Sequence, residues 1–195
     1  MSLSKKEIIK LLLPNLHVEP KLKPSQFIQK YWSQFEQQFG TANVGINGIV
    51  FEELIAITLI RAKIFPFYLQ AKVAFIPSVN YDLLVYSEDF GPIVLSAKTS
   101  LRERWKQTDL EAVALRYIYR QSKSYIISLN EKEVTTRKKD MKSVMALDGF
   151  ILATTPEYDD LLVKLSQVMP QEAPTVKTVE SSFIITNSNY PQRYS

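Results

Sequence analysis

Three short apolar segments between residues 69 and 97 constrain the fold more than any other feature of this chain. The segments cover residues 69–76, 81–86 and 92–97, and turn-forming residues separate them at Pro77-Ser78 and at 87–91. Short runs rich in Val, Ile, Leu and Tyr that are bounded by turns predict β-strands, and short connections predict antiparallel pairing. The sequence therefore predicts three consecutive antiparallel strands.

Helical patterns surround these strands. A helix with an aromatic stripe is expected over residues 25–39, and a strongly apolar helix over 45–63. Pro156 fits the first turn of a last helix that extends to residue 168, with Thr155 as its cap. The remaining expected elements are helices at 4–13, 101–122 and 132–145, and strands at 124–129 and 149–154. This order predicts an α/β (α+β) domain with a mixed sheet and helices on both faces.

The length of 195 residues is enough for one domain with a sizeable core. We expect an N-terminal helical part over residues 1–44, a core over 45–169, and a loosely ordered tail over 170–195. The tail is rich in Pro, Ser, Thr and Asn, and residues 183–186 form a strand-like island within it.

Composition excludes several kinds of chemistry. The chain has no cysteine, which excludes disulfides, thiol catalysis and Cys-zinc sites. His17 is the only histidine, and we expect it to be structural or exposed. No glycine-rich nucleotide-binding motif is present. The first apolar run, residues 8–13, is too short to span a membrane, so we expect a cytoplasmic protein without a membrane partner.

Basic charge is concentrated in the middle of the chain. Residues 98–142 hold 12 Lys or Arg and 6 Asp or Glu, whereas the whole chain has a net charge of +4. A basic stretch of this kind fits either nucleic-acid binding or a solvated helical face, and charge alone favours the solvated face.

Four polar residues around the hairpin predict a site. Asp82 is expected to open the second strand, and Lys98 ends the third, so both lie at the hairpin end away from the turn at 87–91. Ser96 precedes Lys98 by two positions and points to the same side of the strand. Glu111 follows Lys98 by thirteen positions, inside the next helix.

This pattern resembles the active site of PD-(D/E)XK nucleases. It is most similar to the branch of type II restriction endonucleases in which Ser replaces the usual acid before the lysine and a Glu from the following helix supplies the carboxylate. The resemblance assigns these roles to Asp82, Ser96, Lys98 and Glu111. It also implies an acid on the preceding helix, for which Glu52 is preferred over Glu53. The chain departs from the pattern at Tyr81, where the family has proline.

The same branch carries an Arg-acid-Arg triplet after the lysine that reads CC:GG base pairs, and here it corresponds to Arg102, Glu103 and Arg104. The chemistry suits that role, because Arg pairs with guanine O6 and N7 while a carboxylate accepts from cytosine N4. We expect a helix that begins near Ser100 to present the triplet to the major groove of double-stranded DNA.

The resemblance implies Mg²⁺-dependent hydrolysis of DNA by a homodimer. Asp82 and Glu111, with the main-chain carbonyl of Ala97, would bind the metal, Lys98 would stabilise developing negative charge, and Glu52 would orient water or bind a second metal. Two alternatives stay open: a structure-specific or repair nuclease of the same fold, and a non-catalytic DNA-binding module. Taken singly, Lys98 also fits an edge-strand lysine. Glu111 also fits an exposed helical charge that pairs with Arg104, Gln107 or Arg116.

Overall fold

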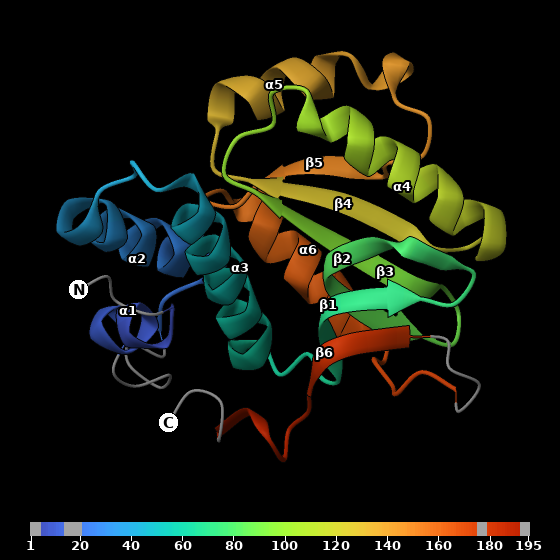
Figure 1. Cartoon of the computed structure of the whole chain (residues 1–195), viewed down its shortest axis with the longest axis horizontal. Helices are drawn as coiled ribbons and strands as arrows, with labels where there is room; N and C mark the ends of the chain where they lie inside the picture. The colour runs from blue at the N-terminus through green and yellow to red at the C-terminus, as the bar shows by residue number, and fades with distance from the viewer. Residues whose placement is uncertain (1–4, 14–20, 175–178, 192–195) are drawn as a thin grey trace.

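The structure, a computed structural model, describes residues 5–13, 21–174 and 179–191, so His17 lies outside the described residues. Its centre is a six-stranded sheet with the strand order β5-β4-β3-β2-β1-β6 (Figure 1). The three predicted antiparallel strands are confirmed as β1 (Phe67–Val73), β2 (Ile76–Ser87) and β3 (Gly91–Lys98). β4 (Lys123–Ser128) and β5 (Gly149–Leu152) continue the sheet in parallel with β3, which makes the sheet mixed.

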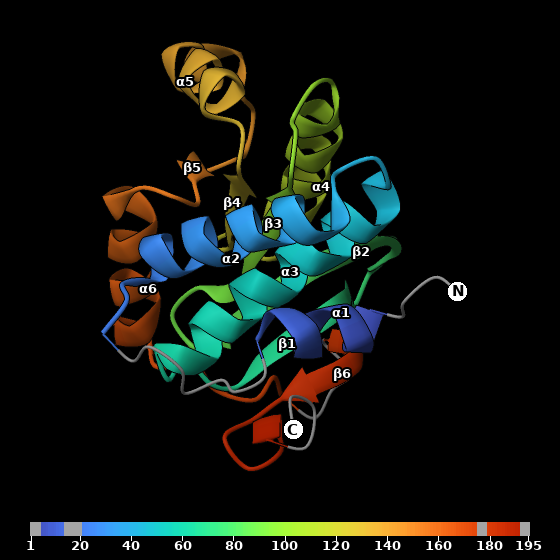
Figure 2. The same ribbon diagram turned by 90° about the vertical axis from the view of Figure 1, so that its left-hand side faces the viewer.

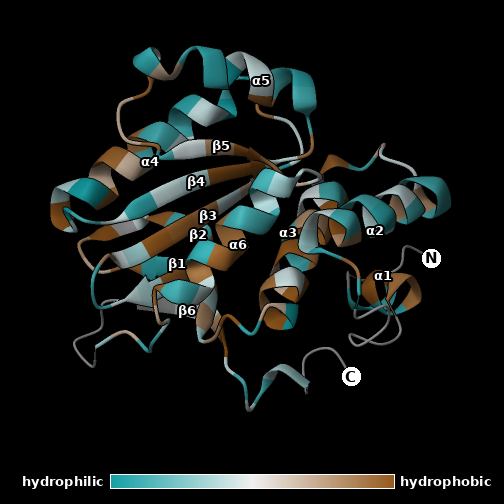
Figure 3. Cartoon of the chain, turned by 180° about the vertical axis from the view of Figure 1, so that it is seen from behind, coloured by the Kyte–Doolittle hydropathy of each residue, from teal (hydrophilic) through white to brown (hydrophobic). Residues whose placement is uncertain are grey.

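Helices cover both faces of the sheet, as predicted (Figure 2). One face packs against α3 (Val44–Arg61) and α6 (Pro156–Gln167), with α1 (Lys5–Leu12) and α2 (Pro24–Phe39) outside them. The other face packs against α4 (Arg104–Ile118) and α5 (Glu131–Lys139). α5 is hydrophilic along most of its length (Figure 3), since it consists mainly of Glu, Lys, Arg and Thr. Val134 is its one buried residue.

Local sequence explains where the long helices of the first face begin. The side chain of Asn43 accepts a hydrogen bond from the N–H of Ile46 and caps α3. Pro24 occupies the first turn of α2, where its missing N–H costs nothing. The carboxylate of Asp159 then accepts from both the N–H and the hydroxyl of Ser25 at 2.8 Å, which joins α2 to α6.

The turn between the first two strands lies earlier than the sequence predicts. Residues 74–75 form the turn, and Pro77-Ser78 belongs to β2. The register places Ala71 opposite Tyr81 but Val73 opposite Ile76. Residues 77–80 therefore bulge out of the ladder opposite a single residue of β1. A bulge tolerates proline because it leaves backbone groups outside the ladder.

The expectation of a loosely ordered tail after residue 170 does not hold for its strand-like part. β6 (Val179–Ile185) pairs with β1 over its whole length and forms the edge of the same sheet. Residues before it are also attached, since the N–H of Gln171 donates to the carbonyl of Tyr86 at 2.9 Å. The free edge of β1 supplies the backbone partners that this segment lacks locally.

Two further expectations need smaller corrections. The basic helix expected over 132–145 ends at Lys139, and a short 3-10 turn, Met141–Ser143, follows it. Asp109 of α4 accepts hydrogen bonds from the three main-chain N–H groups of residues 145–147, which holds that segment out of the helix. Thr155 precedes α6 as predicted, but its hydroxyl donates to the carbonyl of Leu152 and does not cap the helix.

Candidate active site

The carboxylate of Asp82 is the centre of a group of hydrogen bonds between β2 and β3. Its Oδ2 atom accepts from Nζ of Lys98 at 2.7 Å and from Oγ of Ser96 at 3.1 Å. The main-chain N–H of Ala97 donates to the same oxygen at 2.9 Å. The antiparallel register of the two strands places these groups side by side. The structure thus brings Asp82, Ser96 and Lys98 together, although Asp82 lies in the middle of β2 and does not open it.

This ion pair is largely withdrawn from water. The side chain of Asp82 is 13% exposed and that of Lys98 is 20% exposed. A carboxylate in such a position needs donors, and here it has three. All three donate to Oδ2, and among the described residues no hydrogen bond reaches Oδ1. Oδ1 is therefore available to a further ligand.

Glu111 approaches the same group from α4. Burial raises the pKa of its carboxyl, and the charge of Asp82 adds to this rise. The hydrogen bond from Gln107, at 2.9 Å, and the positive charge of Lys98 act in the opposite direction and lower the pKa. The influence of both Asp82 and Lys98 places the Glu111 carboxyl within electrostatic reach of the pair. Of the three helical partners considered from the sequence, Gln107 binds Glu111, whereas Arg116 pairs with Asp148. The Glu111 carboxyl is half-buried, not fully exposed.

Tyr81 occupies the position where the resembling family has proline. Its hydroxyl donates to the main-chain carbonyl of Glu111 at 3.3 Å, and its ring is buried between β2 and α4. Burial raises the pKa of this phenol, so it stays a protonated donor at neutral pH. Tyr81 therefore fixes the turn of α4 that carries Glu111.

The two acids on α3 have different surroundings. Glu52 is partly exposed and accepts a hydrogen bond from the amide of Gln70 at 2.8 Å. Gln70 in turn accepts from the amide of Asn80 at 2.6 Å, which links α3 to the bulge of β2. Glu53 is buried, with 4% of its surface exposed. The preference for Glu52 over Glu53 as the helix acid stays a prediction.

The triplet Arg102, Glu103 and Arg104 lies on the surface directly after Lys98. All three residues are exposed, and Glu103 forms an ion pair with Lys106 that lowers the pKa of its carboxyl. The triplet does not lie in a helix that begins near Ser100, because α4 begins at Arg104. Residues 101–104 instead form a turn in which the N–H of Arg104 donates to the carbonyl of Leu101 at 2.8 Å.

The backbone of Arg102 has a left-handed conformation, with φ of 39°. A side chain larger than glycine is strained there. The N–H groups of Leu101 and Arg102 donate to Glu133 of α5, which explains why the helix begins later than the sequence suggests.

The donor set of this site fits a hard divalent cation. Mg²⁺ commonly binds one or two carboxylates and keeps several waters, and Asp82 and Glu111 each offer a carboxylate oxygen. Within the described ranges, no group of three or more His, Asp or Glu side chains is arranged to bind a metal. A site here would therefore rely on two carboxylates, a main-chain oxygen such as that of Ala97, and water.

Three supporting residues were missed from the sequence: Tyr81, Gln70 and Glu133. Each acts through a contact between elements that are distant in the sequence, and no local pattern indicates such contacts. The one available signal was the departure from proline at position 81.

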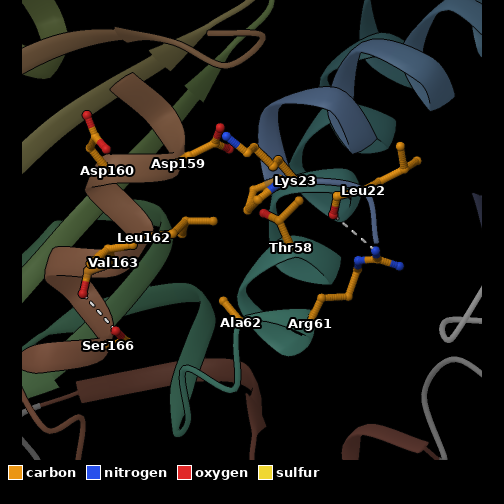
Figure 4. Close-up of a pocket in the computed structure, with 11 residues that line it drawn as sticks. Leu22, Lys23, Thr58, Arg61, Ala62, Asp159, Asp160, Leu162, Val163 and Ser166 are labelled. Atoms are coloured by element: carbon orange, nitrogen blue, oxygen red, sulfur yellow. Dashed lines mark hydrogen bonds between the residues drawn. The ribbon is translucent and has the colours of Figure 1, made fainter. Parts of the chain in front are cut away.

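One cavity of the described surface lies away from these residues. It has a volume of about 610 Å³ and lies between the start of α2, the end of α3 and α6 (Figure 4). Arg61 reaches the carbonyl of Leu22 beside it, and Asp159 and Asp160 line its other side. None of the predicted catalytic or DNA-contacting residues lines this cavity. A duplex is too large for such a cavity, so its position does not argue against a site at Asp82.

Comparison with known proteins supports the fold. No protein-family model and no curated protein matches the chain. A solved structure, restriction endonuclease PspGI in complex with substrate DNA, matches with a TM-score of 0.58 and 17% sequence identity. The match covers 89% of this chain and 84% of that chain. The protein therefore has a mixed α/β fold similar to that of a restriction endonuclease.

The described helices include none that is long and apolar enough to cross a membrane.

Proposed function

We propose that this protein is a type II restriction endonuclease that hydrolyses phosphodiester bonds of double-stranded DNA with Mg²⁺. The observation that carries the proposal is the hydrogen-bonded group of Asp82, Ser96 and Lys98 beside Glu111. It stands on a fold that is similar to that of a restriction endonuclease solved with its substrate DNA.

Asp82 and Glu111, with the carbonyl of Ala97, would hold Mg²⁺, which lowers the pKa of a bound water and neutralises charge on the phosphate. Oδ1 of Asp82 is the oxygen that suits this role, because Oδ2 already accepts three hydrogen bonds. Tyr81 supports Glu111 from the main chain and keeps the two carboxylates on facing elements.

Lys98 places a positive charge at the strand end, beside the carboxylate pair. Its ammonium group would face the scissile phosphate or the attacking water and stabilise the negative charge that grows in the transition state. Ser96 orients Asp82 through a hydrogen bond. Glu52 would orient water or contribute to a second metal site, and Gln70 holds its carboxylate in place.

The exposed turn after Lys98 would read the DNA. Arg102 and Arg104 supply guanidinium groups for guanine, and Glu103 supplies an acceptor for cytosine. Only four positions separate Lys98 from Arg102, so reading and cutting would be coupled through a short segment of chain. The resemblance of this triplet to one that reads CC:GG base pairs implies a recognition site with CC on one strand and GG on the other.

A homodimer is supported by the outer face of α4. Leu110, Val113 and Tyr117 follow helical spacing on that face, and their side chains are 59%, 38% and 83% exposed. Met145, 62% exposed, projects beside them between two hollows of about 500 and 550 Å³. A two-fold interface needs a patch that holds both projections and hollows, and this face has both. We propose that a second copy of the chain covers it, which would set two reading turns at a fixed spacing.

Digestion of a sequenced plasmid with and without Mg²⁺, followed by mapping of the ends, tests the proposal. Discrete double-strand cuts at sites with CC and GG are expected. Random nicks, or a preference for branched DNA, would instead favour a structure-specific or repair nuclease of the same fold. Binding without any cleavage would favour a DNA-binding module.

A further inference from the structure

The side chain of Glu133 in α5 accepts hydrogen bonds from the segment that joins Lys98 to the exposed triplet. Its carboxylate accepts from the N–H of Leu101 at 2.6 Å and from the N–H of Arg102 at 3.4 Å. The hydroxyl of Ser100 lies 3.2 Å and 3.3 Å from its two carboxylate oxygens. One side chain therefore holds three consecutive residues of the segment.

Glu133 is itself held firmly. The side chain of Asn130 caps α5 by accepting from the N–H of Glu133 at 3.0 Å, and the next residue, Val134, is buried. The main chain that carries the carboxylate is thus held against the hydrophobic core that includes Val134, Trp105 and Phe150. The segment it holds is also anchored at one point, because the side chain of Leu101 is 1% exposed in the same core.

α5 also contacts the residue that directly follows the triplet. One helical turn after Glu133, the guanidinium of Arg137 lies 4.8 Å from the ring centre of Trp105, which directly follows Arg104. Contacts with Glu133 and Arg137 of α5 therefore lie at the two ends of the triplet. The side chains of the triplet itself are exposed.

We infer that Glu133 is a positioning residue that sets the reading turn relative to the catalytic lysine and so couples base recognition to cleavage. The inference rests on the proposed function. The turn includes Arg102 in a left-handed conformation, which the chain would not adopt without an external constraint. Loss of the hydrogen bonds to Glu133 would let the backbone of residues 100–102 change conformation. A displacement of about 1 Å is enough to reduce a reaction rate about a hundredfold.

The test compares Glu133→Ala and Glu133→Gln with the matched control Glu131→Gln. Glu131 lies in the same first turn of α5 and is exposed, and its side chain makes no hydrogen bond or ion pair to any described residue. Each variant is assayed for single-turnover cleavage and binding on the cognate duplex and on duplexes with one altered CC:GG pair. Amide hydrogen exchange at Leu101 and Arg102 and the melting temperature are measured on the same samples.

Glu133→Ala is expected to reduce the preference for the cognate duplex at least about tenfold, with non-specific binding unchanged. Exchange at Leu101 and Arg102 should accelerate, whereas Glu131→Gln should match the wild type. Glu133→Gln retains one acceptor oxygen and should fall between them, and it replaces the alanine variant if that one fails to fold.

Two results would overturn the inference without overturning the proposed function. One is an unchanged ranking of duplexes in both Glu133 variants while Lys98→Ala is inactive, which would leave the proposed function intact. The other is an equal loss on every duplex together with a lower melting temperature, which would assign Glu133 a structural role only. If the wild type cuts no DNA at all, the proposed function fails and the coupling fails with it.

Discussion

The ammonium group of Lys98 lies 2.7 Å from Oδ2 of Asp82, on the neighbouring antiparallel strand. Little of either side chain is exposed to water, so each charge depends on the other as its partner. The pair leaves the second oxygen of Asp82 uncommitted. It therefore joins a positive charge to an open carboxylate oxygen, and the proposed metal-assisted hydrolysis would use both.

The first prediction concerns this lysine. Lys98→Ala should reduce cleavage by roughly two to three orders of magnitude, because the proposed role of its charge is to stabilise the transition state. Binding to the cognate duplex should change little. Lys123→Ala is the matched control, since Lys123 forms a similar pair with Asp148 at 3.2 Å on the parallel side of the sheet. Gel-shift and cleavage assays on both variants decide the matter, and normal cutting by Lys98→Ala would contradict the assignment.

The second prediction concerns the pH dependence of cleavage. Burial raises the pKa of Glu111, so this carboxyl gains a proton at a higher pH than an ordinary glutamate. Because only the ionised form binds a metal, activity should fall as pH decreases through the raised pKa. A higher Mg²⁺ concentration should move the acid limb to lower pH, because metal and proton compete for one oxygen.

Rates measured against pH at two Mg²⁺ concentrations test this. Glu111→Ala should be inactive at every pH, and Asp82→Ala likewise. Two outcomes would show that the carboxylate that binds the metal lies elsewhere. One is an acid limb that does not shift with the Mg²⁺ concentration. The other is normal cutting by Glu111→Ala together with an inactive Glu103→Ala.

The third prediction uses the strained backbone of Arg102. Glycine adopts a φ of 39° without a Cβ clash, so Arg102→Gly should keep the free energy of unfolding within about 1 kcal/mol of the wild type. Cognate binding should nevertheless weaken by about tenfold or more, because a bidentate guanine contact contributes roughly 1–3 kcal/mol. Chemical denaturation and binding on the same sample check both halves. Unchanged binding would remove Arg102 from the reading turn.

The fourth prediction separates base reading from phosphate contact. Glu103→Ala should relax the preference at a cytosine and leave non-specific binding unchanged. Lys139→Ala should instead weaken binding to every sequence and reduce the salt dependence of binding. Lys139 suits this comparison better than Lys138, which is paired with Glu157. Equal losses on all duplexes for Glu103→Ala would favour the repair nuclease.

The fifth prediction concerns the second copy of the chain. Tyr117→Glu should convert a dimer to a monomer, because it replaces the most exposed of the three apolar side chains on the outer face of α4 with a charge. Val163→Glu, on an exposed position of α6, is the control. Light scattering over a range of concentrations measures the state. A wild-type monomer, or a dimer that survives Tyr117→Glu, would exclude this face.

Much of the fold could be predicted because its signals are local. The strand period of two places Ser96 and Lys98 on one side of β3, and a short hairpin brings both to Asp82. The apolar pattern of residues 45–63 likewise identifies α3, and the turn residues at 87–91 identify the hairpin of β2 and β3. The turn predicted at Pro77-Ser78 lies instead at residues 74–75.

Only the tertiary structure decided the contacts between distant segments. β6 joins the sheet because β1 has a free edge, although the two strands lie more than a hundred residues apart. α4 begins later than the sequence predicts because Glu133, about thirty residues away, accepts hydrogen bonds from the N–H groups of Leu101 and Arg102. Adjacent residues such as Glu52 and Glu53 differ in burial because the packing of α3 sets its rotation. Local sequence thus determined which elements form and which polar residues follow each strand, whereas packing between elements determined their limits and their partners, because backbone donors bind whatever acceptor the fold brings to them.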